Sequence, residues 1–192
     1  PRFVYLFKRL ETQVFLMLEG MVEEFSVSLF RPVCFEKDLG DGSPVFFEYG
    51  GEKIPLYGRI DRVDMWENGG KKYVRVIDYK TGAKKFDYTD VEYGLGIQLL
   101  LYLFALAAGD ESIIPAGVFY TPALQKTIRV ECGKTREKIL GEVAKASRRS
   151  GVMLDDIGVI LAMESIPGGS GARFLPVTLY GKGGERRTKK TG

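Results

Sequence analysis

The sequence is poor in features that would mark a membrane protein or a nucleotide-driven enzyme. It has no histidine, only two cysteines and one tryptophan in 192 residues. No internal repeat, low-complexity tract, phosphate-binding loop or glycine-rich dinucleotide fingerprint occurs, so we expect no ATPase site in this chain. The longest apolar run, residues 97–108, is interrupted by Gln98 and Tyr102. It falls short of the roughly 18 residues that indicate a membrane span, so nothing points to a membrane segment or to export.

The scarcity of cysteine also bears on the cellular compartment. Cys34 and Cys132 lie on separate segments with strand character. This favours reduced thiols in a cytoplasmic protein over a disulfide framework, although a single bridge between them stays open.

Composition and charge are those of one ordinary globular domain. Hydrophobic residues make up 45% and charged residues 28%, which predicts a single domain over residues 1–192. The chain begins without methionine inside a helical pattern, so we expect a piece of a larger protein. The net charge is +3, but residues 181–192 carry five basic side chains and one acidic one. We expect this basic tail to be a flexible, solvated linker, and charge alone does not predict nucleic-acid binding.

Periodicity predicts a mixture of helices and strands. Apolar residues in segment 2–28 recur at the spacing of one helix face, and acids such as Glu24 are expected at its surface. Further segments are predicted as strands at 33–39, 45–49, 116–121, 127–131 and 173–180, and as helices at 90–108, 134–149 and 155–163.

The chemistry is concentrated in a predicted hairpin near the middle of the chain. Residues 54–65 and 73–79 are rich in β-branched and aromatic residues, and the Glu-Asn-Gly-Gly sequence at 67–70 is a turn signal. The pattern predicts two antiparallel strands joined by a tight turn.

The turn sets which acids face each other. A two-residue loop of Gly69 and Gly70 places Asp61 directly opposite Asp78, whereas a loop one residue earlier moves the register by two. In either register the two carboxylates share a face of the sheet. Because side chains alternate along a strand, Lys80 points to the same side as Asp78.

Two carboxylates facing each other need a compensating charge. Like charges across a ladder are destabilising, and a divalent cation would offset them. Oxygen ligands favour Mg²⁺ or Mn²⁺, and Lys80 could then orient or deprotonate a water and neutralise charge on a phosphate. Glu36, on a neighbouring predicted strand, could support such a site. The alternative is that the polar residues of an ordinary hairpin form its solvated face: Asp61, Asp64, Lys71, Lys72 and Arg75.

Three motifs in order carry a resemblance to a known family. They are Gly58-Arg59-Ile60-Asp61, Ile77-Asp78-Tyr79-Lys80-Thr81-Gly82 and Gln98-Leu99-Leu100-Leu101-Tyr102. These resemble the GxxD, DYK and QxxxY motifs of the RecB-like nucleases in the PD-(D/E)XK superfamily. Segments 30–36, 91–102 and 151–156 also resemble the nuclease domain at the C-terminal end of the B subunits of bacterial AddAB helicase-nucleases. The similarity spans nearly the whole chain.

The resemblance implies a fold and an activity. The expected fold is α/β, a restriction-endonuclease-like core with a central mixed sheet flanked by helices. The expected activity is metal-dependent hydrolysis of phosphodiester bonds in DNA, with an exonuclease trimming one unwound strand within an ATP-dependent helicase-nuclease that processes double-strand breaks for recombinational repair. The partners implied are single-stranded DNA and the helicase-nuclease A subunit.

The resemblance also assigns roles to residues. Asp61, Asp78 and the backbone carbonyl of Tyr79 would bind Mg²⁺ or Mn²⁺, and Lys80 would position or deprotonate the attacking water. Gln98 and Tyr102, four apart on one helix face, would lie beside the active site. The basic pair Lys84 and Lys85, which follows the DYK motif, would contact DNA phosphate.

Two features depart from the family. Its GxxxH motif needs a histidine, and this chain has none, so we expect that the motif either lies before Pro1 or is absent. Its four-cysteine iron–sulfur set is also not supported, because Cys34 and Cys132 do not have that spacing. These departures leave two rivals: a non-catalytic DNA-binding or assembly module of a repair complex that retains the nuclease shape, and a stand-alone RecB-like exonuclease.

Overall fold

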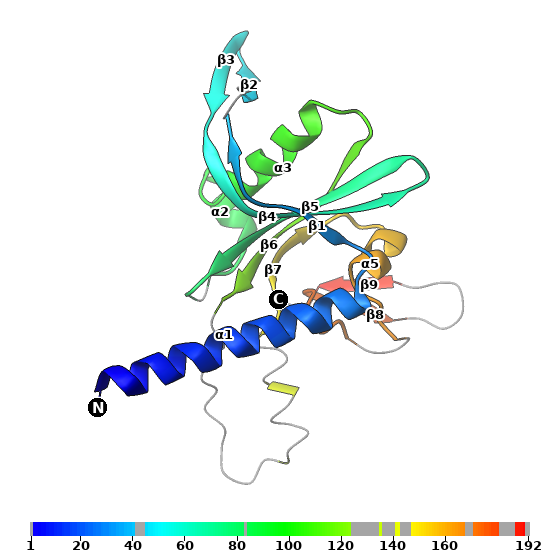
Figure 1. Cartoon of the computed structure of the whole chain (residues 1–192). Helices are drawn as coiled ribbons and strands as arrows, with labels where there is room; N and C mark the ends of the chain where they lie inside the picture. Colours follow the sequence, from blue (N-terminus) through cyan, green and yellow to red (C-terminus); the bar gives the residue numbers. More distant parts are fainter. Residues whose placement is uncertain are drawn as a thin grey trace.

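The molecule is built around one five-stranded sheet. The computed structural model (Figure 1) describes residues 2–40, 45–82, 84–123, 135, 141–142, 147–167, 171–180 and 187–190. Across the sheet, the order is β1 (Arg31–Leu39), β4 (Gly58–Asn68), β5 (Lys71–Lys80), β6 (Ile113–Pro122) and β7 (Ser150–Met153). The β5–β6 pair is parallel and the other pairs are antiparallel. The expected α/β fold with a central mixed sheet flanked by helices is therefore confirmed.

The central hairpin has the first of the two registers that the turn sequence allows. β4 and β5 pair regularly from Asn68 opposite Lys71 to Arg62 opposite Ile77, with Gly69 and Gly70 as the two-residue loop. Both glycines have positive φ, 59° and 75°, as the favoured hairpin turn requires. Asp61 and Asp78 are the next residues along the two strands.

The connection between the two parallel strands of the sheet is helical. The connection contains α2 (Tyr88–Glu92) and α3 (Gln98–Ala108), and α3 packs on β5 and β6. The sequence predicts one helix over residues 90–108, but the chain is broken at Gly94 and Gly96, whose φ values are 75° and 67°. An α-helix cannot continue through the left-handed region, so two helices form.

Each face of the sheet has its own apolar core. On the α3 face, buried residues of β5 and β6 such as Val76 and Val118 pack with Leu99 and Leu103. On the opposite face, Ile77 and Phe119 pack with α5 (Ile157–Met163). Strand alternation thus assigns odd and even positions of β5 to different cores.

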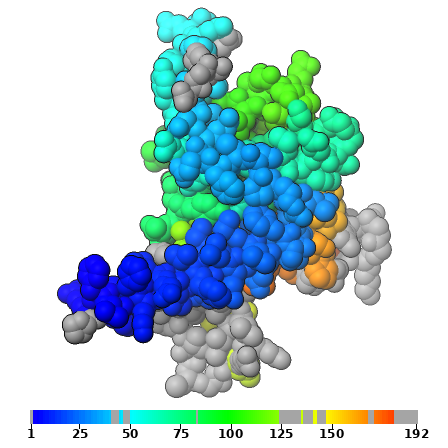
Figure 2. All heavy atoms as spheres, viewed as in Figure 1, coloured from blue at the N-terminus to red at the C-terminus, as the bar shows by residue number. Residues whose placement is uncertain are grey.

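The first helix is long and only partly covered. α1 (Arg2–Val27) confirms the predicted amphipathic helix, and its N-terminal half extends beyond the rest of the molecule (Figure 1, Figure 2). Met17 and Met21 are half-buried, whereas Leu10 and Val14 each stay 57% exposed. The expectation that Glu24 lies at the surface is wrong, because it is 2% exposed. Three buried arginines surround it, and these lie far from it in sequence.

Smaller elements complete the described chain. β2 (Val45–Tyr49) pairs with β3 (Glu52–Leu56), and β8 (Val177–Tyr180) pairs with β9 (Arg187–Lys190). Part of the expected basic tail is therefore a strand. The predicted strand at 127–131 and most of the predicted helix at 134–149 lie outside the described residues. Among the helices that the structure describes, none combines the length and the hydropathy needed to cross a membrane.

Candidate active site

Asp78 and Lys80 lie side by side at the end of β5. Both follow Val76 at intervals of two, so they project from the same face of the sheet, as predicted, and this is the face on which α3 packs. Lys80 Nζ lies 2.6 Å from Asp78 Oδ2, with side chains 37% and 18% exposed. The pair thus sits at the carboxyl end of the parallel β5–β6 pair, partly open to solvent.

Asp61 reaches the same end of β5 from the neighbouring strand. The regular β4–β5 ladder stops at Arg62, and Asp61 Oδ2 then accepts a 2.7 Å hydrogen bond from the Tyr79 backbone N–H. Tyr79 is the residue between Asp78 and Lys80. The hydrogen bond therefore holds the Asp61 carboxylate beside the other two groups.

In β4, the alternation of side chains between the two faces of the sheet is interrupted at Asp61. Ile60 packs in the α3-side core, whereas Arg62, two positions later, contacts α1 on the opposite face. Simple alternation would put both on one side. On β1, Glu36 has φ of 49°, and the β1–β4 register has no Glu36–Asp61 pair although both flanking pairs are present. This irregularity turns Asp61 out of the ladder.

Glu36 is placed opposite Asp61 but points to a different partner. Its Oε2 lies 3.7 Å from Arg59 Nη1, and its side chain is 66% exposed. Within the described ranges, no group of three or more acidic, cysteine or histidine side chains converges to hold a metal. A supporting metal role for Glu36 therefore stays a prediction.

The charge on Lys80 is fixed by the two acids. The pKa of Lys80 is raised above its usual range by its hydrogen bond to Asp78. Burial works against this rise, while the negative charges of Asp78 and Asp61 add to it. Lys80 is therefore an ammonium at neutral pH, suited to orienting an oxygen and neutralising a phosphate.

Gln98 and Tyr102 form a pair on α3 that contacts β4. Gln98 Nε2 donates to the Tyr102 hydroxyl, and Tyr102 is 4% exposed. A Cβ added at Gly58 would lie 2.5 Å from Tyr102 Cζ and closer still to the hydroxyl. Only glycine leaves room for this phenol, so the GxxD and QxxxY motifs meet three residues from Asp61.

A buried tyrosine links the site to the basic segment after β5. Tyr120 is the register partner of Asp78, and its ring lies 5.9 Å from Lys80 Nζ and 4.6 Å from Lys84 Nζ. Its hydroxyl donates to the Gly96 carbonyl at 3.4 Å. Lys84 and Lys85 are both exposed, and Lys84 lies over the same ring as Lys80. A phosphate contact by either lysine stays a prediction.

The arrangement joins two carboxylates, an ammonium and a backbone carbonyl at one strand end, in the order of the three motifs. The model of the PD-(D/E)XK nuclease superfamily matches residues 2–156, which is most of the chain. The chain belongs to the PD-(D/E)XK nuclease superfamily.

Curated relatives place this PD-(D/E)XK chain more closely. It is 34% identical over 173 residues to the B subunit of the ATP-dependent helicase/deoxyribonuclease of Clostridium acetobutylicum, covering 85% of this chain and 15% of that protein. The proteins of the same name from Ruminiclostridium cellulolyticum and Thermoanaerobacter sp. are 38% and 36% identical, covering 85% and 93% of this chain. The matched segment covers 15% of the Ruminiclostridium cellulolyticum protein and 16% of the Thermoanaerobacter sp. protein. The resemblance to helicase-nuclease B subunits is confirmed, and the chain spans about a sixth of their length.

The donor set of this PD-(D/E)XK site suits a hard divalent ion, the kind that the superfamily generally uses. Asp61, Asp78 and the Tyr79 carbonyl could supply oxygens, and Mg²⁺ commonly keeps several waters beside one or two carboxylates. Asp78 Oδ2 is shielded from water, and Lys80 is the cation beside it. Two carboxylates and one backbone oxygen suit a divalent ion that keeps several waters. The Lys80 ammonium offsets part of the charge on Asp78.

Nothing in the described part of the PD-(D/E)XK domain supplies an iron–sulfur cluster. Cys34 is a free, partly buried thiol, and Cys132 lies outside the described residues.

The largest feature that sequence reasoning missed is a buried charge cluster behind the site. We name it the five-charge cluster; it consists of Glu24, Arg62, Asp64, Arg75 and Arg149, each at most 5% exposed. Arg62 bonds both Asp64 oxygens at 2.6 Å, Arg75 bonds Asp64 at 2.8 Å and Glu24 at 2.6 Å, and Arg149 bonds Glu24 at 2.5 and 2.8 Å. Asp64 and Arg75 are each 0% exposed, so the alternative that places them on a solvated face of the hairpin is wrong for these two residues.

Proposed function

We propose that this chain is a metal-dependent deoxyribonuclease domain that hydrolyses phosphodiester bonds in DNA. The observation that carries the proposal is the meeting of Asp61, Asp78 and Lys80 at the end of β5, held by the Asp61 to Tyr79 N–H bond and the Lys80 to Asp78 ion pair. The superfamily match and the deoxyribonuclease relatives support the same activity.

The metal would be Mg²⁺ or Mn²⁺. Asp61, Asp78 and the Tyr79 carbonyl would hold it, with water at the remaining positions. When bound, the ion supplies Lewis acidity and lowers the pKa of a bound water. The Asp61 carboxylate has one oxygen engaged by the Tyr79 N–H, so its other oxygen is the one available to the ion.

Lys80 acts as a cation rather than as a free amine. Because its pKa is raised by Asp78, it orients the attacking water through an N–H and neutralises charge that develops on the phosphate. Lys84, held over the Tyr120 ring, contacts the phosphate backbone nearby. Gln98 and Tyr102 fix α3 against Gly58 and so keep Asp61 in place.

In the longer protein we expect this domain to act on DNA that a helicase has unwound. The relatives are named as B subunits of an ATP-dependent helicase/deoxyribonuclease. By that likeness, the domain trims a single strand as an exonuclease, works with an A subunit and serves the recombinational repair of double-strand breaks. The protein would then act in the cytoplasm.

A second candidate is a DNA-binding or assembly module without catalysis. The observation that favours it is the complete lack of histidine, because the family motif GxxxH cannot be present in this chain. The two candidates differ in one respect that can be measured. Only the nuclease hydrolyses DNA, and it needs a bound divalent ion to do so.

The deciding experiment measures Mn²⁺ binding and cleavage together. We expect the chain to bind Mn²⁺, and expect Asp61→Asn and Asp78→Asn each to weaken that binding at least about tenfold, because each removes a charged ligand. The matched control is Asp90→Asn, an exposed acid in α2. End-labelled single-stranded DNA should be degraded in Mg²⁺ by the parent and control, but not by the two site variants or in EDTA.

Either of two results would count against the nuclease. Mn²⁺ binding that is equal in all four proteins would remove the metal site. Metal binding that depends on Asp61 and Asp78, together with DNA that stays intact under every condition with this chain and with the longer protein that contains it, would favour the non-catalytic module. Circular dichroism and thermal unfolding should show that all variants are folded before either result is interpreted.

A further inference from the structure

Tyr79 is held by two adjacent residues of β4. Its backbone N–H donates to Asp61 Oδ2 at 2.7 Å, and its hydroxyl accepts a hydrogen bond from Arg62 Nη1 at 2.9 Å. The regular β4–β5 ladder has already ended at the pair of Arg62 and Ile77. Beyond that pair, two side-chain hydrogen bonds therefore connect β4 to Tyr79, the residue between the acid and the lysine of the proposed site.

Arg62 is a fixed donor. Its Nε and Nη2 bond the two Asp64 oxygens at 2.6 Å each, and Nη2 also lies 3.2 Å from Glu24 Oε1. Its guanidinium carbon is 4.9 Å from the centre of the Phe25 ring, and the side chain is 0% exposed. A planar guanidinium held in this way presents Nη1 to the Tyr79 hydroxyl in one direction.

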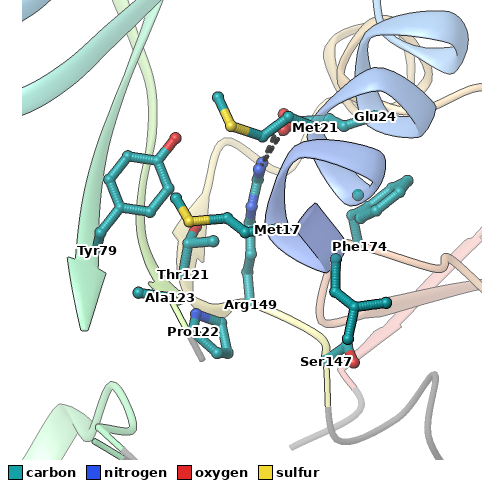
Figure 3. Close-up of a pocket in the computed structure, with 12 residues that line it drawn as sticks. Met17, Met21, Glu24, Tyr79, Thr121, Pro122, Ala123, Ser147, Arg149 and Phe174 are labelled. Atoms are coloured by element: carbon teal, nitrogen blue, oxygen red, sulfur yellow. Dashed lines mark hydrogen bonds and ion pairs between the residues drawn. The ribbon is translucent and has the colours of Figure 1, made fainter. Parts of the chain in front are cut away.

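Packing alone does not fix the Tyr79 ring. The ring forms one wall of a cavity of about 90 Å³ between α1 and the ends of β5 and β6 (Figure 3). Other walls include Met17 and Met21, which are flexible side chains and only half-buried. A ring with a cavity on one side has fewer atoms in contact with it there and can turn toward that space. Its direction therefore depends on the hydrogen bond from Arg62.

We propose that the Tyr79 hydroxyl is a positioning group for the metal site, through which Arg62 places the Tyr79 backbone beside Asp61. The inference rests on the proposed function, in which the Tyr79 carbonyl and the Asp61 carboxylate hold the ion. A turn of the ring shifts the backbone to which it is attached, and with it the N–H that orients Asp61. Hydrogen bonds behind the ligands orient them in the same way at many metal sites. Because Glu24 bonds the same arginine, the docking of α1 takes part in this placement.

Tyr79→Phe tests the proposal, because it removes one hydroxyl and keeps the ring. The matched control is Tyr73→Phe, at the other end of β5 on the same face, where the ring contacts Trp66. We expect Tyr79→Phe to bind Mn²⁺ about tenfold more weakly than the parent, the lower end of what the loss of such a hydrogen bond costs. Tyr73→Phe should bind Mn²⁺ as the parent does. Thermal unfolding should show that both variants are folded.

A second measurement needs no metal. Hydrogen exchange of the residue-79 amide, followed by NMR in EDTA, reports the hydrogen bond from that N–H to Asp61. We expect this amide to exchange about fivefold faster in Tyr79→Phe, the factor of one ordinary hydrogen bond, while the amides of Val74 and Val76 keep the parent rates. A loss of global stability alone would speed up all three amides together.

A double-mutant cycle tests the part played by Arg62. Arg62→Met removes the donor and leaves two guanidiniums against two carboxylates in the five-charge cluster. In that background Tyr79→Phe should change the Mn²⁺ affinity by less than about twofold, because both substitutions break the same hydrogen bond. A full tenfold loss in the Arg62→Met background would overturn the role of Arg62.

The proposal as a whole is overturned if Tyr79→Phe keeps the parent affinity for Mn²⁺, whatever the exchange rate of its amide. A parent chain that binds no Mn²⁺ would instead count against the proposed nuclease. The exchange measurement then decides alone: a faster residue-79 amide in Tyr79→Phe supports the placement of Asp61 by the hydroxyl, and an unchanged rate overturns it.

Discussion

Gly58 shows how one missing side chain connects two motifs. The Tyr102 phenol occupies the space that any Cβ at position 58 would need, and Gln98 donates to the phenol oxygen. Strand alternation predicts that Asp78 and Lys80 share a face, because that relation is local. The Gly58–Tyr102 contact joins residues far apart in sequence and depends on how α3 docks on β4. No local pattern specifies that docking, so the sequence alone could not predict the contact.

Gly58→Ala should therefore displace α3 and disturb the candidate site. We expect the free energy of unfolding to fall by about 1–3 kcal/mol, the usual range for overpacking a core. Metal binding at Asp61 should weaken as well, since Asp61 lies three residues along β4. Urea unfolding and Mn²⁺ binding measure the two effects.

Gly109→Ala is the matched control, because a Cβ there meets nothing within 4 Å and the glycine has no positive φ. It should leave both quantities near the parent values. The double variant Gly58→Ala with Tyr102→Leu shortens the obstructing side chain and should recover part of the Mn²⁺ affinity. Equal behaviour of Gly58→Ala and Gly109→Ala would show that the helix and strand are not in tight contact.

At the scale of elements, α1 is attached to the sheet largely through the five-charge cluster. Glu24 contributes the carboxylate from the helix and bonds arginines from β4, β5 and the segment before β7. The glycine turn limited the β4–β5 register to two possibilities, and both put Asp61 and Asp78 on one face. The cluster was not predictable, because Arg62 and Asp64 alternate with apolar residues in the same way on a solvated face and on a buried one. Only the position of α1 distinguishes the two.

Stability should depend on pH through Glu24. Burial alone would raise its pKa, but the charge and hydrogen bonds of Arg149, with Arg75 and Arg62, lower the pKa from 4.5 to about 2. A lowered carboxyl pKa stabilises the fold above the unfolded value and loses that effect as pH falls. We expect roughly 3 kcal/mol of the free energy of unfolding to disappear between pH 5 and pH 2.

Urea unfolding at a series of pH values tests this with two variants. Glu24→Gln should lower the free energy of unfolding by about 3 kcal/mol or more at pH 7, because it leaves buried guanidiniums unpaired, and should flatten the acid slope. Glu19→Gln, an exposed position of α1, should keep the parent slope. A Glu24→Gln protein with an unchanged slope would assign the acid sensitivity to other groups.

At the scale of the whole molecule, α1 carries many apolar side chains that no other described part of the chain covers. Ten large apolar residues along α1 are at least 44% exposed, and the first seven of them lie in its N-terminal half: Phe3, Val4, Tyr5, Leu6, Phe7, Leu10, Val14, Phe15, Leu18 and Val22. Contiguous apolar surface of this kind mostly marks a place where other protein packs. The sequence predicted the helix and its apolar face correctly, since 3.6-residue spacing is local. It could not predict how much of that face the sheet covers.

The chain should therefore self-associate as its concentration rises. Removing exposed apolar area from water is worth roughly 25 cal/mol per Å². Contact between the exposed apolar side chains of two α1 helices is therefore favourable at high concentration. Sedimentation velocity over a hundredfold range of concentration should show the parent growing in mass. The double variant Leu10→Lys with Val14→Glu should stay monomeric with little change in thermal stability, because both side chains are exposed. Phe104→Lys, an equally exposed apolar position on α3, should associate as the parent does. If Phe104→Lys prevents association while the α1 variant does not, the contact between copies is made by α3, and the exposed apolar residues of α1 do not pair with a second copy.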